Sequence, residues 1–126
     1  MAKEVLVVTE EEDVAEFLQL ALRSEGYEVR LASDWEEASG LYAERRPDVV
    51  LASLAGDGAG TCGPSQVSQA AEWRETHREV PAVLLAGDLS HHERELARRS
   101  FDRLLDRHVL EVSELLRSLD ELTSAE

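Results

Sequence analysis

Three stretches of the chain are almost continuously apolar, and they restrict the possible folds more than any other feature. The stretches are EVLVV at 4–8, VVLASL at 49–54 and AVLLAG at 82–87. A strand with one face in water alternates apolar and polar residues, and these stretches do not alternate. We therefore expect buried strands of a parallel sheet, covered on both faces.

The stretch after the first predicted strand has the period of a helix. Its apolar residues recur every three or four positions, and Gly26 lies just past Ser24 as a stop signal. We therefore predict a helix over 11–24 with one apolar stripe. The stripe consists of Val14, Phe17, Leu18, Ala21 and Leu22.

The alternation of strand and helix continues along the chain. A second strand is expected at 27–31 and a fifth near 103–105. Five strands alternating with five helices over 126 residues predict a single α/β domain with a doubly wound parallel sheet. The tail of this domain, residues 123–126, is expected to be frayed. The second helix is expected from a cap at Ser33 or Asp34 to about Glu44, and the third from Pro64, with Val67, Ala70 and Ala71 on its buried side. The fourth is expected to begin at a cap at Ser90 and to contain HHERELARR. The fifth is expected to carry an apolar stripe of Leu115, Leu116, Leu119 and Leu122.

Charge and composition exclude several classes of function. The chain has 27 acidic and 13 basic residues, a net charge of −14 that repels nucleic acid. No apolar run approaches the roughly 20 residues of a membrane span, and MAKEVLVVTE lacks the pattern of a signal peptide, so we expect a cytoplasmic domain without a membrane partner. Cys62 is the only cysteine, and no Cys/His cluster has metal-ligand spacing. We therefore predict no metal and no cofactor.

Function is expected at the carboxyl edge of the predicted sheet. Right-handed crossovers bring the loops after the strands to this edge, where α/β proteins bind ligands. Ser53 ends the third predicted strand with a hydroxyl, which is a weak nucleophile without a base; Glu10 and Glu11 are conceivable bases. We predict no catalytic residues and no enzyme. The residues expected to converge at this edge are Thr9, Glu10, Ser53, Ala86 and those after Leu105.

The order of these segments resembles the receiver domains of two-component response regulators over nearly the whole chain. The resemblance implies a flavodoxin-like fold with strand order 2-1-3-4-5 and a role in signalling. The matching segments are VLVVTEEEDVAEFLQLALRSEGYEV, ASDWEEA, ERRPDVVLASL, VPAVLLAG and FDRLLDRHV.

The resemblance also implies positions for the residues of a phosphorylation site. Active members of the family carry a pair of acids after strand one, an aspartate acceptor at the end of strand three, a Thr or Ser after strand four and a Lys-Pro after strand five. Only Glu10 keeps this chemistry here. The corresponding positions are Thr9 and Glu10, Ser53, Ala86, and Arg107 with His108, and Leu104 stands at the family's aromatic switch position.

These replacements predict a degenerate form of the family, a pseudo-receiver. With Thr9 and Ser53 in place of two acids, the ligand charge falls from about −3 to about −1, which is too little for Mg²⁺. We therefore expect a phosphorylation-independent module that signals through protein contacts. Arg107 is a candidate to pair with Glu10 in the former phosphate pocket.

Two alternatives remain open for this edge of the sheet. The chain can be an unconventional receiver that accepts phosphate on another residue, such as Asp57. It can also bind a small ligand or nucleotide, although AGDGAGTCG lacks the GK[ST] ending of a phosphate loop.

The arginine-rich segment over residues 94–107 is the centre of the candidate partner face. Its plain interpretation is a solvated surface neutralised by pairs such as Glu95 with Arg99. In the resembled family, however, helix four, strand five and helix five form the usual dimer and partner face, so we expect a signalling protein or a second copy of the chain to bind here. The residues assigned to this face are Arg94, Arg98, Arg99, Arg103, Glu111 and Glu114, with Asp120 and Glu121 nearby.

The two tryptophans are further candidates for contact with a partner. Trp73 lies off the apolar stripe of its predicted helix. Large aromatic side chains outside the core are enriched at interfaces. Trp35 and Trp73 are therefore interpreted either as contact residues or as peripheral packing.

Overall fold

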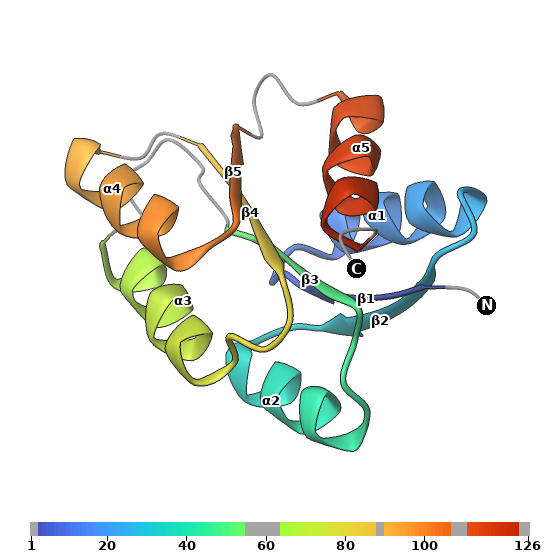
Figure 1. Cartoon of the computed structure of the whole chain (residues 1–126), viewed down its shortest axis with the longest axis horizontal. Helices are drawn as coiled ribbons and strands as arrows, with labels where there is room; N and C mark the ends of the chain where they lie inside the picture. Colours follow the sequence, from blue (N-terminus) through green and yellow to red (C-terminus); the bar gives the residue numbers. More distant parts are fainter. Residues whose placement is uncertain (1–2, 55–63, 88–89, 107–110, 124–126) are drawn as a thin grey trace.

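The computed structural model describes residues 3–54, 64–87, 90–106 and 111–123, which form a five-stranded parallel sheet between two layers of helices (Figure 1). The strand order β2-β1-β3-β4-β5 confirms the predicted topology. In register, Val7 of β1 pairs with Leu31 of β2 and with Leu51 of β3. The strands are β1 (Glu4–Val8), β2 (Glu28–Ala32), β3 (Val49–Ser53), β4 (Ala82–Ala86) and β5 (Arg103–Asp106).

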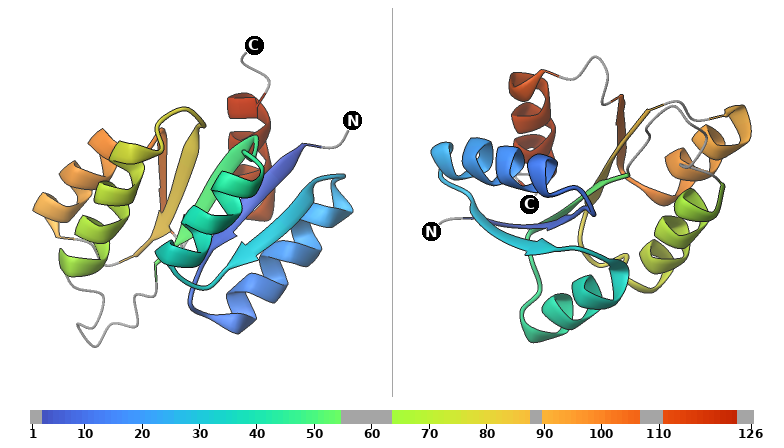
Figure 2. Two further views of the ribbon diagram at one scale, coloured as in Figure 1. Left: turned by 90° about the horizontal axis from the view of Figure 1, so that it is seen from below. Right: turned by 180° about the vertical axis from the view of Figure 1, so that it is seen from behind.

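Five helices connect and follow these strands. Two of them, α1 and α5, cover one face of the sheet, and α2, α3 and α4 cover the other (Figures 1 and 2). In the described part of the chain, no helix is both long and apolar enough to cross a membrane. The helices are α1 (Glu12–Ser24), α2 (Trp35–Glu44), α3 (Pro64–Thr76), α4 (His91–Ser100) and α5 (Val112–Thr123).

The absence of alternation in the three apolar stretches is explained by two separate cores. Leu6 and Val50 pack with Ala38 of α2 on one face, whereas Val7 and Leu51 pack with the helices of the other face. All residues of β1, β3 and β4 are buried as a result. Both faces of each central strand therefore need apolar side chains, as predicted.

Local signals begin and end the helices as expected. Asp34, rather than Ser33, is the N-cap of α2, and its carboxylate accepts a hydrogen bond of 2.7 Å from the Glu37 amide. Ser90 and Glu93 form a capping box at the start of α4. Gly26 has a φ of +91°, which suits the turn after α1.

Two predictions of burial were wrong. Phe17 belongs to the predicted stripe of α1 but is 52% exposed, because Leu18 and Leu22 occupy the centre of the contact with the sheet. Trp73 is only 6% exposed and belongs to the core. Its position off the stripe of α3 turns it toward α2, where its indole N–H donates to Ser39 Oγ at 2.8 Å.

The end of the chain is helical as far as Thr123. Its hydroxyl donates to the Leu119 carbonyl at 2.9 Å and accepts from Lys3 Nζ at 3.1 Å. The predicted stripe of α5 is present, since Leu115 and Leu119 are fully buried. Of the tail predicted to fray, Thr123 is instead part of α5, and residues 124–126 lie outside the described part.

Candidate functional site

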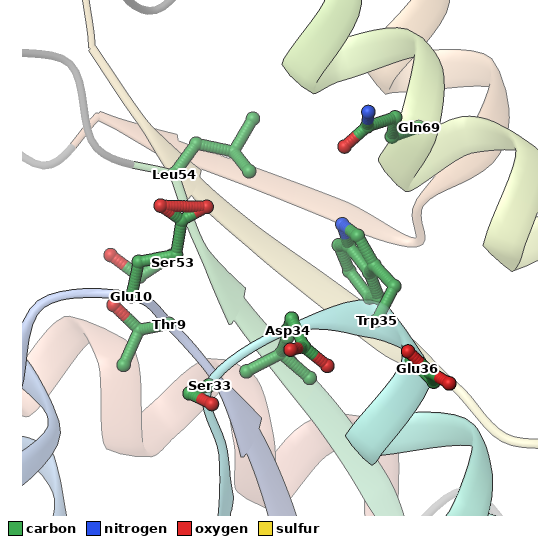
Figure 3. Close-up of a pocket in the computed structure, with 10 residues that line it drawn as sticks. Thr9, Glu10, Ser33, Asp34, Trp35, Glu36, Ser53, Leu54 and Gln69 are labelled. Carbon is green, nitrogen blue, oxygen red and sulfur yellow. The ribbon is translucent and has the colours of Figure 1, made fainter.

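A cleft of about 300 Å³ lies at the carboxyl edge of the sheet, beside the ends of β1 and β3 and the start of α2 (Figure 3). The cleft has apolar walls and an acidic rim. Figure 3 shows Glu10 and Ser53 on one side of it and Trp35 and Gln69 on the other. The lining residues are Val8, Thr9, Glu10, Ser33, Asp34, Trp35, Glu36, Ser53, Leu54 and Gln69.

Parallel pairing brings Thr9 and Ser53 to this edge. Val8 pairs with Ala52 in the register of β1 and β3, so the residue after each of them lies at the same level. Both side chains are nearly inaccessible, with exposed fractions of 6% for Thr9 and 4% for Ser53. Two hydroxyls therefore stand at neighbouring strand ends, as the sequence predicted.

The Thr9 hydroxyl has a structural role that the sequence analysis missed. Its Oγ1 accepts a hydrogen bond of 3.2 Å from the Glu11 amide. Glu11 is the N-cap of α1 and makes no capping bond with its own side chain. Thr9 therefore supports the turn from β1 into α1, a common use of a threonine hydroxyl.

Three carboxylates surround the cleft, from Glu10, Asp34 and Glu36. Each of these residues is exposed. None of them forms an ion pair within the described ranges, and no lysine or arginine is among the described lining residues. The described lining of the cleft therefore carries a net negative charge.

The donor set does not fit the magnesium ion that the resemblance implies. Mg²⁺ requires several hard oxygen ligands at near-octahedral positions. Between residues 3–54, 64–87, 90–106 and 111–123, no group of three or more His, Cys, Asp or Glu side chains is placed to hold a metal ion. Of the positions that the resemblance assigns to acids at the ends of β1 and β3, Glu10 keeps a carboxylate, whereas Thr9 and Ser53 do not.

Several other predicted site residues lie away from the cleft or outside the described structure. Ala86 is buried at the end of β4 and is not a lining residue. Leu104 is half-buried in β5 and packs against the core between the sheet and helices α2, α3 and α4. Arg107 with His108, and Asp57 with Cys62, lie outside the described residues, so the pairing of Arg107 with Glu10 stays a prediction.

The predicted partner face is largely exposed. The expected pair of Glu95 with Arg99 is absent from the described ion pairs, and Arg103 instead binds Glu121 at 2.7 Å. The α4 arginines have no acidic partner in the part of the chain described. The exposed members of the face are Arg94, Arg98, Arg99, Arg103, Glu111 and Glu114.

An aromatic cluster between α2 and α3 was not predicted as a unit. The rings of Trp35 and Trp73 are 5.0 Å apart, and His77 stacks on Trp73 with a centroid distance of 4.0 Å. Tyr42 packs edge-on against Trp73 and His77, and burial raises the pKa of its hydroxyl. The i, i+4 spacing of Trp73 and His77 was the available sequence signal.

A second hollow of about 350 Å³ adjoins this cluster and is lined by Trp35, Gln69, Glu72 and Trp73. Trp35 and Gln69 also line the cleft at the carboxyl edge. The two hollows therefore share a wall. We call them together the α2–α3 groove.

At the amino edge of the sheet, buried charges are paired. Glu4 is buried in β1, and its carboxylate binds Arg30 at 3.0 Å and also binds Arg45. The hydrogen bond from Arg45 to the Glu4 carboxylate raises the pKa of Arg45. The Glu4 amide donates to Asp48 at 2.7 Å. The network joins the starts of β1 and β3 to β2.

Arg74 is a second buried charge at the amino edge. Its guanidinium donates to the carbonyls of Ser100 at 2.9 Å and Val80 at 2.6 Å, and it binds Asp102 at 2.7 Å. Asp102 also accepts from the Ala82 amide at 2.8 Å. Burial lowers the pKa of Arg74, although Asp102 opposes this effect. Arg74 therefore ties α3 to the starts of β4 and β5.

Solved structures with the same architecture are receiver domains of response regulators, whereas no family model matches the chain. A CheY-like response regulator receiver domain protein from Methanospirillum hungatei JF-1 has a TM-score of 0.80 and 16% identity, over 98% of this chain and 95% of that chain. The chemotaxis protein CheY4 of Vibrio cholerae has a TM-score of 0.74 and 20% identity, over 97% and 99%.

A longer protein also contains this fold. NtrX from Brucella abortus, solved in complex with ATP, has a TM-score of 0.76 and 22% identity over 98% of this chain, but the match covers only 27% of NtrX. The chain thus spans about a quarter of that protein. Together with the strand order 2-1-3-4-5, these similarities establish that the chain has the fold of the response regulator receiver (CheY-like) domains.

Proposed function

We propose that the chain is a receiver-like signalling module that acts through protein contacts and does not carry a phosphoryl group. The observation that supports this most directly is Ser53 at the end of β3. The resemblance assigns the phosphate-accepting aspartate to this position. A serine cannot form the acyl phosphate that an aspartate forms.

The surroundings of Ser53 support the same proposal. Phosphoryl transfer depends on cations that neutralise the charge on the moving group. Thr9 replaces one acid, and its hydroxyl already accepts a hydrogen bond from the Glu11 amide. Of the three positions that the resemblance assigns to acids, Glu10 keeps its carboxylate, which is too little negative charge to bind Mg²⁺ well.

The chemistry near Ser53 also argues against an enzyme. A serine nucleophile needs a base within hydrogen-bond reach, and that base is usually oriented by a third group. No histidine is among the described residues that line the cleft. Glu10 remains the conceivable base, and it is exposed to solvent.

The partner face on α4, β5 and α5 supplies the surface for such a module. Arg94, Arg98 and Arg99 project from α4 without an acidic partner in the described structure. Glu111 and Glu114 are exposed at the start of α5. A two-fold arrangement of two copies would bring these opposite charges together, so a second copy is one candidate partner beside other signalling proteins.

Treatment with acetyl phosphate and Mg²⁺, followed by intact mass spectrometry, tests the absence of phosphoryl transfer. We expect no phosphoryl adduct on the wild-type chain. The double variant Thr9→Asp/Ser53→Asp is expected to gain Mg²⁺ binding and some labelling, because it restores two carboxylates. A receiver known to accept phosphate serves as the positive control.

Two results would contradict the proposal. The first is a stoichiometric phosphoryl group on any residue of the wild-type chain, which would identify an unconventional receiver. The second is magnesium-dependent binding of beryllofluoride near Ser53, monitored by NMR.

A further inference from the structure

We propose that the α2–α3 groove docks an arginine-bearing segment of a partner protein. This surface is separate from the partner face on α4, β5 and α5. The proposal goes beyond the proposed function, because a module that lacks phosphoryl transfer need not use this groove. The two ideas are tested by different measurements and can fail separately.

The charge around the groove identifies the chemistry of the segment. Glu10, Asp34 and Glu36 border the first hollow, and Glu72 borders the second. Among the described residues that line either hollow, none is a lysine or arginine. These four acids give the described lining a net negative charge, which favours a cationic partner.

The walls of the groove favour a guanidinium group over a simple ammonium. Trp35 lines both hollows, and its ring is supported by Trp73 at a centroid distance of 5.0 Å. A guanidinium is planar and weakly hydrated, so it stacks well on an indole. Val8 and Leu54 provide apolar surface for the aliphatic part of an arginine side chain.

An anion is disfavoured at the same place. The start of α2 would ordinarily attract an anion through its free amides. Here the Glu37 amide is occupied by the Asp34 carboxylate at 2.7 Å, and the first turn carries Glu36 and Glu37. A phosphate group or nucleotide would therefore meet negative charge.

The size of the groove favours a peptide segment over an isolated cation. The cleft of about 300 Å³ and the adjoining hollow of about 350 Å³ share Trp35 and Gln69, so they can accept neighbouring parts of one chain. The acids come from the turn after β1, from the start of α2 and from α3, and within the described part they form no group placed to hold a metal ion. A bare ion would leave most of the groove unfilled.

Fluorescence anisotropy with a labelled peptide tests this proposal on the full chain. The probe is a short extended peptide with two arginines, and its matched control carries citrulline at both positions. We expect saturable binding of the arginine peptide and loss of binding with citrulline, which has the same shape without the charge.

Matched variants of the chain locate the binding surface. Glu36→Gln/Glu72→Gln removes two acids from the groove and is expected to weaken binding about tenfold. Glu44→Gln/Glu95→Gln removes the same charge from exposed positions outside the groove and is expected to change affinity less than twofold. Trp35→Leu is expected to weaken binding through loss of the stacking surface, with folding checked by circular dichroism.

Four outcomes would overturn the proposal. The first is no saturable binding of the arginine peptide, and the second is an equal loss of affinity in the two double variants, which would indicate diffuse charge attraction. The third is agmatine binding as tightly as the peptide, which would indicate a site for a small cation. The fourth is self-association that Glu36→Gln/Glu72→Gln abolishes in sedimentation, which would identify a second copy as the occupant.

Discussion

The charged side chains at the two edges of the sheet differ in burial and in pairing. At the amino edge, Glu4 and Arg74 are buried, and each is held by ion pairs and hydrogen bonds. At the carboxyl edge, Glu10 and Glu36 are exposed around a cleft and form none of the ion pairs found within the described ranges. The paired charges at the amino edge tie the strands together, whereas the exposed acids at the carboxyl edge are accessible to a partner.

The difference follows from the free-energy cost of burying a charged side chain. Burying a charge without a partner is costly, so the charges at the amino edge have several partners each. The exposed acids at the carboxyl edge keep their hydration and cost little in the free chain. Three variants test this comparison.

The largest effect is expected from Arg74→Met. The change leaves the carbonyls of Ser100 and Val80 without this donor, and it removes the cationic partner of Asp102. We expect the free energy of unfolding to fall by about 3 kcal/mol, measured by urea denaturation. Arg98→Met, at an exposed position of α4, is the control, and an equal loss in both variants would contradict a special role for Arg74.

A smaller loss is expected from Glu4→Gln, which keeps the shape of the side chain and removes its charge. The glutamine amide has one acceptor oxygen for Arg30 and Arg45 in place of two, and both ion pairs are lost. Because Arg45 is largely exposed, we expect a loss of about 2 kcal/mol in the free energy of unfolding. Glu16→Gln on the exposed side of α1 is the matched control. If the two variants are equally stable, the amino-edge network does not stabilise the fold.

The smallest effect, and the only one of opposite sign, is expected from Glu10→Gln/Glu36→Gln at the carboxyl edge. Removing unpaired like charges should raise the free energy of unfolding by a few tenths of a kcal/mol at low salt, and added salt should erase the gain. Parallel urea titrations in low and high salt measure this. A loss as large as that of Glu4→Gln would show that these carboxylates hold the fold together.

Much of the candidate site was predictable because it depends on strand ends. The apolar stretches located β1 and β3, and parallel pairing then placed Thr9 and Ser53 at one edge. Ala86 was also placed correctly at a strand end, but it is not a lining residue of the cleft. Which strand ends border a cleft depends on where the helices lie, and a strand pattern does not contain that information.

The groove between α2 and α3 was beyond the reach of a sequence pattern. Trp35 and Trp73 are separated by 38 positions, and their contact depends on how two helices pack on the same face of the sheet. For the same reason, Trp73 was interpreted as a contact residue or as peripheral packing, whereas it belongs to the core. The partners of Arg74 come from α4 and the start of β5, which no local rule connects to α3.

The amino-acid sequence alone determined the alternation of strands and helices, the double burial of the central strands, and the helix ends at Gly26, at Ser33 or Asp34, and at Ser90. These features depend on periodicity and on contacts between near neighbours, which a linear pattern records. Only the tertiary structure decided which charges are paired and which aromatic rings meet. Those contacts join segments far apart in the chain, and their energies depend on burial, which exists only after the layers have packed.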